Sequence, residues 1–252
     1  MKVPYITIAA IVVSVFSLNA IKGYVSNVVT NKLTTSVITE IAEETESNSV
    51  EDDIVKNVPL NLEAEVKEYV SPINFNDLKE INNDVVSYIK IGENVSYPVL
   101  YDGTDKYLDH DIYGNKSASG AIYMDSKLDP TGALRVIYGH HMNDSWVTKE
   151  EGSMFAIVDD YTNADQFNSE TPINVYYEYK EVSLKPMACV VGKADAELRN
   201  INTADDLRNF AADKTIAQGE ISEFSGDLYV LVTCNYWAND NRTYLFCVGE
   251  EV

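Results

Sequence analysis

The sequence predicts a mainly β protein with a few helices (α+β), in which short strands close into a barrel. Two observations support this: many short β-branched and aromatic runs are separated by turn signals, and few segments have helical periodicity. Closing such a sheet removes its exposed edges. From residue 73 to residue 252 the chain has a length that suits one domain with a single core.

The first predicted element after residue 73 is a helix over residues 76–89. Asn76 or Asp77 can cap it, and its apolar residues recur at spacings of three and four, as on a helix with one buried face. These apolar residues are Leu78, Ile81, Val85 and Tyr88. Strands are expected next, at residues 97–101, 120–125, 134–142, 173–179 and 182–192.

Two further helices and a final pair of strands complete the prediction. A short helix is expected over residues 153–161, and Thr203 can cap another over residues 204–212. The apolar residues of the first that should point inward are Met154, Phe155 and Val158. Residues 227–249 then read as two strands joined by a polar loop.

Three of the predicted strand ends carry residues whose side chains can take part in catalysis. Cys234 stands where the apolar run of the penultimate strand stops, and Arg242 precedes the last strand. The strand at residues 134–142 contains His140 and His141. A nearby cation or a paired imidazole lowers the pKa of a thiol and makes it a better nucleophile, and an acyl transfer also needs a proton donor for the leaving group.

Each of these residues has an ordinary structural explanation when it is taken alone. A single cysteine such as Cys234 is most often a small buried hydrophobe, and a single arginine such as Arg242 is most often a surface ion-pair partner. The third histidine, His110, lies in a polar segment and is expected to be solvated or in a turn. The combination of thiol, imidazole and guanidinium is what favours a catalytic site.

The residues Tyr138-Gly139-His140, Thr233-Cys234 and Arg242 resemble, in this order, the signature of sortases, the cysteine transpeptidases of Gram-positive cell surfaces. The resemblance extends upstream through FNDLKEINNDVVSYIKI, SYPVLYDGTDKYLDHDIYG and SASGAIYMDSKLDP, and covers about residues 73–252. It implies a closed sortase-type barrel decorated by an N-terminal helix and by a helix before the strand that ends in Cys234. Class B is the better subclass, because the pre-domain linker has no Asp-Pro-aromatic triplet and no second membrane helix follows the domain.

The resemblance also implies a mechanism. Cys234 is the nucleophile that forms a thioester, His140 is the general acid and base, and Arg242 stabilises the substrate carbonyl or its oxyanion. The implied substrates are secreted proteins whose C-terminal LPXTG-like or NPXTX-like sorting signal is cleaved after Thr. The implied acceptor is an amine of peptidoglycan or of its lipid-linked precursor, and no cofactor is implied.

The choice between the two histidines follows from strand geometry and from the family motif. Neighbouring side chains on a strand point to opposite faces, so only one imidazole can meet the thiol, and the motif selects His140. Tyr138 and Leu108 are candidate groove residues, and Thr233 is a candidate for the substrate pocket. Core packing and strand propensity explain these three equally well.

A membrane segment is expected at the N-terminus. Residues 3–21 are uncharged and lie between Lys2 and Lys22; as a helix they would span about 28 Å of a hydrocarbon core of about 30 Å. A cleavable signal peptide ending near Ala20 is the alternative. The resemblance favours a single-pass protein of the cell membrane with an extracytoplasmic catalytic domain. The expected division is residues 1–24 as anchor, 25–72 as acidic extracytoplasmic tether and 73–252 as catalytic domain.

Composition restricts the function classes. The formal net charge is −21 and no basic stripe is present, so no nucleic-acid partner is expected. The sequence has no calcium-loop motif, and no metal or other cofactor is expected. Cys189 and Cys247 lie in apolar runs and should be reduced and buried, although a bridge between neighbouring strands is an alternative.

Two rival functions remain open. A cysteine peptidase would use the same acyl-enzyme and release it to water, and capture of the acyl group by an added amine distinguishes the two. A non-catalytic tethered surface module would hold Cys234 and His140 for structural reasons, and would be unaffected by loss of the thiol.

Overall fold

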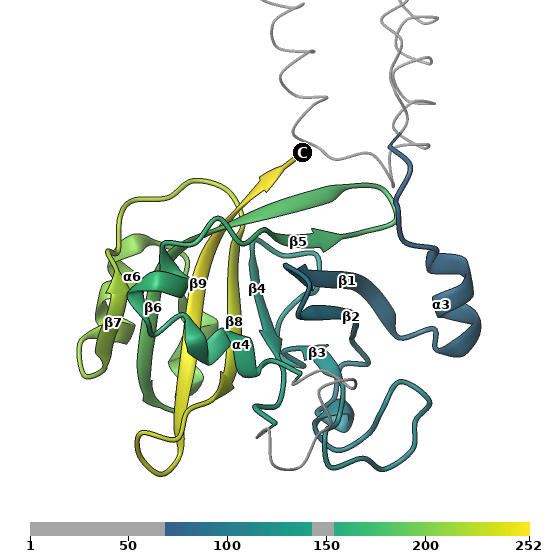
Figure 1. Cartoon of the computed structure of the whole chain (residues 1–252), viewed down its shortest axis with the longest axis horizontal. Helices are drawn as coiled ribbons and strands as arrows, with labels where there is room; N and C mark the ends of the chain where they lie inside the picture. Colours follow the sequence, from purple (N-terminus) through teal and green to yellow (C-terminus); the bar gives the residue numbers. More distant parts are fainter. Residues whose placement is uncertain (1–68, 143–153) are drawn as a thin grey trace, which may run out of the picture. The chain divides into compact units, whose positions relative to one another are not determined.

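The computed structural model describes residues 69–142 and 154–252, which belong to one compact unit, Val66–Val252. Eight strands in the order β5-β1-β2-β3-β4-β8-β9-β6 form a ring that the β5–β6 pairing closes, and β7 is added outside it, on β6 (Figure 1). The strands are β1 Val85–Ile91, β2 Val95–Leu100, β3 Ile122–Met124, β4 Leu134–Tyr138, β5 Ile173–Tyr176, β6 Glu181–Lys193, β7 Thr215–Gly219, β8 Leu228–Cys234 and β9 Asn241–Glu251. The prediction of a closed, mainly β barrel with helical decorations is confirmed.

Short helices decorate the barrel. They are α3 Phe75–Ile81, η1 Lys106–Leu108, α4 Ala156–Asp160, α5 Ala164–Phe167, η2 Ala196–Asn200 and α6 Ala204–Ala211. The predicted cap of α6 is confirmed, because Thr203 and Asp206 form a reciprocal capping box. The apolar residues expected to point inward around α4, Met154, Phe155 and Val158, are all buried.

The predicted helix over residues 76–89 is wrong in its second half. Helix α3 begins after the cap residue Asn74 and ends at Ile81, and strand β1 follows after a short turn. The β1 sequence VVSYIKI is rich in β-branched residues, and its burial alternates with period two as it pairs with β2 and β5. In the turn, the Asn82 side chain donates hydrogen bonds to Tyr107 Oη and Ile112 O, which stabilises the break between helix and strand.

Strand β7 was not expected from the sequence. Its five residues TIAQG are exposed or half-buried, and it pairs with β6 across a register shift. A strand that buries so little surface has no clear alternation of apolar and polar residues. The sequence signal for β7 is therefore weak.

Strand β8 is buried on both faces, which explains its unbroken apolar run. Tyr229 and Leu231 point into the barrel core, whereas Val230 and Val232 pack on the outside against a second cluster. That outer cluster contains Leu207 and Phe210 of α6, and burying each of these side chains contributes on the order of 2 kcal/mol. The strand that carries Cys234 is thus packed between the barrel core on one face and α6 on the other.

The expected single-pass membrane localisation is corrected. Within residues 69–142 and 154–252, no helix combines the length and the apolar character needed to cross a bilayer. The segment on which the expectation rested, residues 3–21, lies outside the described residues, as do the residues 25–68 of the expected tether.

Candidate active site

Cys234 and Arg242 face each other at one end of the barrel. They are the last pair in the antiparallel register of β8 and β9, so the hairpin places thiol and guanidinium side chains on the same face. This face continues the outer side of the sheet, where Val232 is paired with Tyr244. The Arg242 guanidinium donates a hydrogen bond from Nη1 to Asn241 O at 2.9 Å, and it has four further N–H groups.

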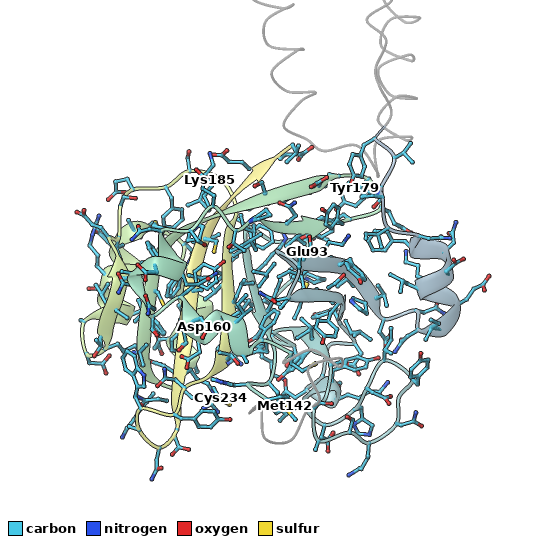
Figure 2. The ribbon with its side chains drawn as sticks, viewed as in Figure 1. Glu93, Met142, Asp160, Tyr179, Lys185 and Cys234 are labelled. Atoms are coloured by element: carbon cyan, nitrogen blue, oxygen red, sulfur yellow. The ribbon has the colours of Figure 1, made fainter. Side chains whose placement is uncertain are left out.

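Strand β4 brings the histidine pair to the same end of the barrel. It runs parallel to β8 with Tyr138 paired to Val232, and Gly139 N donates to Val232 O at 3.1 Å. Thr233 Oγ1 donates to Gly139 O at 2.9 Å, so the two chains remain side by side up to His140 and Cys234. Figure 2 shows Cys234 and Met142, two residues after His140, at this end of the structure.

Gly139 lets the chain after β4 lie close against the side chains of Ile122 and Phe155. A Cβ atom at this position would lie 2.5 Å from Ile122 Cδ1 and 2.6 Å from Phe155 Cγ, so a larger residue would displace the core. The absence of a side chain at Gly139 therefore serves a close approach of the backbone to the core.

His140 turns toward the loop that contains η1. Its Nε2 lies 2.7 Å from Leu108 O, and because a carbonyl oxygen only accepts hydrogen bonds, Nε2 carries a proton in this arrangement. In the neutral ring, Nδ1 is then the basic nitrogen. The Leu108 side chain is 50% exposed beside this contact.

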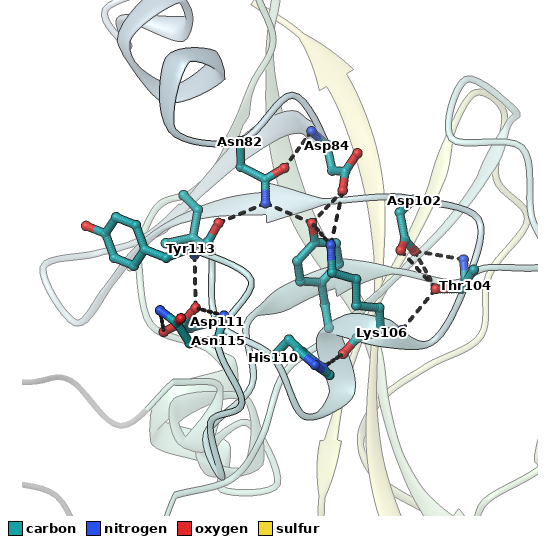
Figure 3. Close-up of polar contacts among 11 residues, drawn as sticks. Asn82, Asp84, Asp102, Thr104, Lys106, His110, Asp111, Tyr113 and Asn115 are labelled. Carbon is teal, nitrogen blue, oxygen red and sulfur yellow. Dashed lines mark hydrogen bonds and ion pairs between the residues drawn. The ribbon is translucent and has the colours of Figure 1, made fainter.

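The loop that holds Leu108 is anchored by its own polar contacts (Figure 3). Tyr107 Oη donates to Asp84 Oδ2 at 2.6 Å and accepts from Asn82, which ties η1 to the start of β1. His110 Nδ1 lies 3.0 Å from Lys106 O and 2.6 Å from Asp109 Oδ1, so this imidazole is engaged within its own loop. His110 was expected to be solvated or in a turn; instead it is half-buried and forms an isolated antiparallel bridge with Lys116.

The His141 side chain lies on the opposite side of the sheet from that of His140. Its Nδ1 lies 2.9 Å from Cys234 O and 3.7 Å from Asp159 Oδ2, and its ring lies 4.8 Å from the ring of Tyr236. Asp159 was not singled out from the sequence. The signal that could have found it is a carboxylate next to the apolar residues of a short buried helix.

Tyr138 is held by a buried carboxylate. Its Oη donates to Asp125 Oδ2 at 2.9 Å, and its ring stacks on Tyr123 at 5.5 Å. Burial and the Asp125 carboxylate raise the pKa of Tyr138, whereas burial followed by the carboxylates of Asp105 and Asp125 raises the pKa of Tyr123 to about 12. Both phenols are therefore neutral donors in the wall beneath the candidate site.

Asp125 itself is ionised in spite of its burial. Burial opposes the charge, but hydrogen bonds from Arg199, Lys127 N and Tyr138 together lower the pKa of the Asp125 carboxyl. Arg199 Nε lies 2.9 Å from both carboxylate oxygens, so η2 is joined to the turn after β3. This ion pair was also missed in the sequence, because its partners are 74 residues apart.

Leu108, a candidate for the groove, and Thr233, a candidate for the substrate pocket, differ in accessibility. Thr233 is 2% exposed and directs its hydroxyl to β4, whereas Leu108 is exposed.

Within residues 69–142 and 154–252, no three or more His, Cys, Asp or Glu side chains are grouped to hold a metal ion.

The three cysteines are free, and only Cys234 is not buried. The prediction that Cys189 and Cys247 are reduced and buried is confirmed. Burial, followed by the charge of Asp159, raises the pKa of the Cys189 thiol to about 12, and burial likewise raises that of Cys247. The two buried thiols therefore remain protonated at neutral pH.

The fold is that of the class B sortases. No protein-family model matches the chain, and no curated protein sequence does. Among solved structures, sortase B of Clostridium perfringens superposes with a TM-score of 0.57 at 24% identity, over 70% of this chain and 100% of the other.

Two further sortase structures show the same similarity. A Staphylococcus aureus sortase B–substrate complex has a TM-score of 0.58 at 21% identity, over 71% of this chain and 85% of the other. A Streptococcus pyogenes class B sortase involved in pilus biogenesis has a TM-score of 0.58 at 20% identity, over 71% and 98%. At these identities the similarity establishes the fold, and the chemistry has to be argued from the residues.

Proposed function

We propose that this chain is a sortase-type cysteine transpeptidase in which Cys234, His140 and Arg242 act together. The observation that carries the proposal is the pairing of Cys234 with Arg242 at the end of β8 and β9, beside the strand end of β4 that bears His140. A nucleophile, a proton-transfer group and an oxyanion donor are the parts that acyl transfer requires.

In the first half of the reaction, the Cys234 thiolate attacks a peptide carbonyl and Arg242 donates hydrogen bonds to the oxygen that becomes negative. The C–N bond then breaks, a protonated His140 gives a proton to the departing amine, and a thioester remains on Cys234. In the second half, an incoming amine attacks the thioester, His140 accepts its proton, and the C–S bond breaks to regenerate the thiolate.

The contacts of His140 suggest which nitrogen transfers the proton. Nε2 is bound to Leu108 O, so Nδ1 is the atom free to exchange a proton with the amine. In the part of the chain that the structure describes, no hydrogen bond joins the Cys234 thiol to the imidazole of His140 or His141. Such contacts often tighten only when substrate is bound.

For the substrate we propose a secreted protein with a C-terminal LPXTG-like or NPXTX-like sorting signal, cleaved after its Thr, and for the acceptor an amine of peptidoglycan. The support is the match of fold to a sortase B solved with its substrate. The exposed Leu108 beside His140 offers an apolar contact for such a peptide.

The test is incubation of the full chain with a panel of LPXTG-like and NPXTX-like peptides, with and without short amines. Peptide cleavage after Thr is expected, together with a mass increase on Cys234 equal to the N-terminal fragment less one water, and added amine should be joined to that fragment. A Cys234→Ala variant is the control and should do neither. Cleavage that amines never intercept would favour the peptidase, and cleavage that Cys234→Ala retains would remove Cys234 as the nucleophile.

A further inference from the structure

A polar cluster lies on the inner side of the sheet, directly behind the candidate active site. We call Asp159, His141, Asn235 and Thr243 the Asp159 cluster. Asp159 Oδ1 accepts a hydrogen bond from Asn235 Nδ2 at 2.6 Å and a short one from Thr243 Oγ1, and Asp159 Oδ2 lies 3.7 Å from His141 Nδ1. Asn235 and Thr243 are buried, and the side chains of His141 and Asp159 are less than one-fifth exposed.

The members of this cluster have a simple relation to the candidate catalytic residues. His141 follows His140, Asn235 follows Cys234, and Thr243 follows Arg242. Neighbouring residues of a strand point to opposite faces, so the residues that face the candidate site are each backed by a residue that faces Asp159. One carboxylate thus connects the three chain segments that bring the thiol, the imidazole and the guanidinium together.

The contacts also define the protonation of His141. Its Nδ1 lies 2.9 Å from Cys234 O, and a carbonyl can only accept, so Nδ1 is the donor. Asp159 Oδ2, on the same nitrogen, favours a proton at that position. His141 therefore holds the backbone of the nucleophile rather than its sulfur.

The backbone around Cys234 is fixed at three successive residues. Thr233 donates its hydroxyl to Gly139 O, the Cys234 carbonyl accepts from His141, and the Asn235 side chain binds Asp159. In addition, Asn235 N donates to Asn241 O at 3.0 Å, which closes the hairpin loop. These contacts restrain where the Cys234 side chain can lie relative to β4 and β9.

We propose that Asp159 is a positioning residue, which acts through His141, Asn235 and Thr243 to hold Cys234, His140 and Arg242 in register. This rests on the proposed transpeptidase function. Asp159 touches none of the reacting atoms. Its effect is on orientation, and misplacing a reacting group by about 1 Å costs about 100-fold in rate.

The first test is Asp159→Asn in the full chain, with Asp165→Asn as the matched control. Asp165 is exposed on the neighbouring helix α5 and outside the cluster, so its variant removes the same charge without touching the cluster. In Asp159→Asn an amide N–H replaces one carboxylate oxygen, so it points either at His141 Nδ1 or, with the amide turned over, at the donors of Asn235 and Thr243, and in both cases donor faces donor. We expect kcat to fall about 10- to 100-fold with KM changed less than about 3-fold, because substrate contacts are intact.

The second test uses two replacements of His141 that differ in where they place a donor. The amide nitrogen of Asn occupies about the position of Nδ1, whereas that of Gln reaches about the position of Nε2. His141→Asn should therefore keep the bond to Cys234 O and remain within about 3-fold of the wild type, whereas His141→Gln should lose about 10-fold in kcat. Equal losses in the two variants would contradict the proposal, and this comparison remains decisive if Asp159→Asn does not fold.

Amide hydrogen exchange tests the positioning without any turnover. Peptides that contain Gly139 and Asn235 should exchange faster in Asp159→Asn than in the wild type and in Asp165→Asn, because their backbone donors bind across the restrained segments. If the wild type processes no peptide, the transpeptidase proposal fails while the exchange result still decides the role of Asp159. Equal exchange and equal kcat in the Asp159 and Asp165 variants would overturn the inference.

Discussion

His140 and His141 are adjacent in the chain and have different surroundings. His140 is bound to the carbonyl of Leu108 in an outer loop, and His141 is bound to the carbonyl of Cys234 beside Asp159. Both histidines lie just beyond the end of β4 at Tyr138, and their contacts follow the alternation of sides that strand geometry predicts. In the proposed mechanism this alternation separates the residue that exchanges protons with the substrate from one that supports the backbone.

This division predicts unequal effects of alanine at the two positions. His140→Ala should lower the rate of thioester formation by about 100- to 10,000-fold, which is the usual contribution of a general acid. His141→Ala should lower it by only about 10-fold, because backbone restraint is lost but the proton donor is kept. Single-turnover measurement of the thioester by mass spectrometry checks both rates. Equal losses would show that the assignment of His140 is wrong.

The three cysteine thiols also differ from one another in their accessibility to solvent. Cys234 is partly accessible, whereas Cys189 and Cys247 are fully buried and burial raises the pKa of both, that of Cys189 to about 12. Iodoacetamide near neutral pH should therefore label the folded protein at Cys234 and leave the other two unmodified until the protein is unfolded. Peptide mapping reports the labelled position, and Cys234→Ser should abolish labelling of the folded protein. Modification of Cys189 in the native state would contradict the burial.

At the scale of elements, α6 covers the outer face of the strand that ends in Cys234. Leu207 and Phe210 of this helix pack in the cluster that contains Val230 and Val232 of β8. The helix has only eight residues, so its stability depends on its capping box and on this packing. A change at its N-terminus should therefore weaken the support of β8.

The cap gives a direct prediction. Thr203→Ala removes the side-chain oxygen that accepts from Asp206 N, and should lower the free energy of unfolding by about 1 kcal/mol. Thr203→Ser keeps that oxygen and should cost much less. Urea unfolding followed by circular dichroism measures both values. A loss as large in the serine variant as in the alanine variant would mean that the methyl group, and not the cap, is the source of stability.

At the scale of the whole molecule, the closed barrel buries many phenols and thiols away from water. Burial is the largest factor that raises the pKa of three tyrosines to about 12. They are Tyr123, Tyr161 and Tyr244. Burial raises the pKa of Cys189 to the same range. In the unfolded chain such groups lose their protons at about pH 8.5 for Cys and about pH 10 for Tyr.

Stability should therefore decrease in alkaline solution. Above about pH 8.5 the unfolded chain binds fewer protons than the folded one, so the free energy of unfolding falls as pH rises, and it continues to fall up to about pH 12. Below about pH 8.5 these groups have no effect. Urea midpoints between about pH 7 and about pH 10.5 test this. A midpoint that stays constant over this range would contradict it, and Tyr244→Phe should reduce the slope because it removes one of the titrating groups.

By itself, the sequence determined the class of fold, the positions of most strands, the capped helix α6 and the three strand ends that carry candidate catalytic residues. These features depend on local signals: β-branched runs, the Thr203 cap and the change from apolar to polar residues at Cys234. Local signals were misleading at residues 85–89. Their apolar residues fit a helical period, but they form part of strand β1, which pairs with β2 and β5.

Only the tertiary structure decided which residues meet. The register of β4, β8 and β9 brings the end of β4, just before His140, alongside the end of β8, where Cys234 is paired with Arg242, and it gathers His141, Asn235 and Thr243 around Asp159. Partners such as His141 and Cys234 are 93 residues apart in the chain. The physical reason is that strand pairing and barrel closure are non-local, and local propensities carry no information about which strand ends will be neighbours.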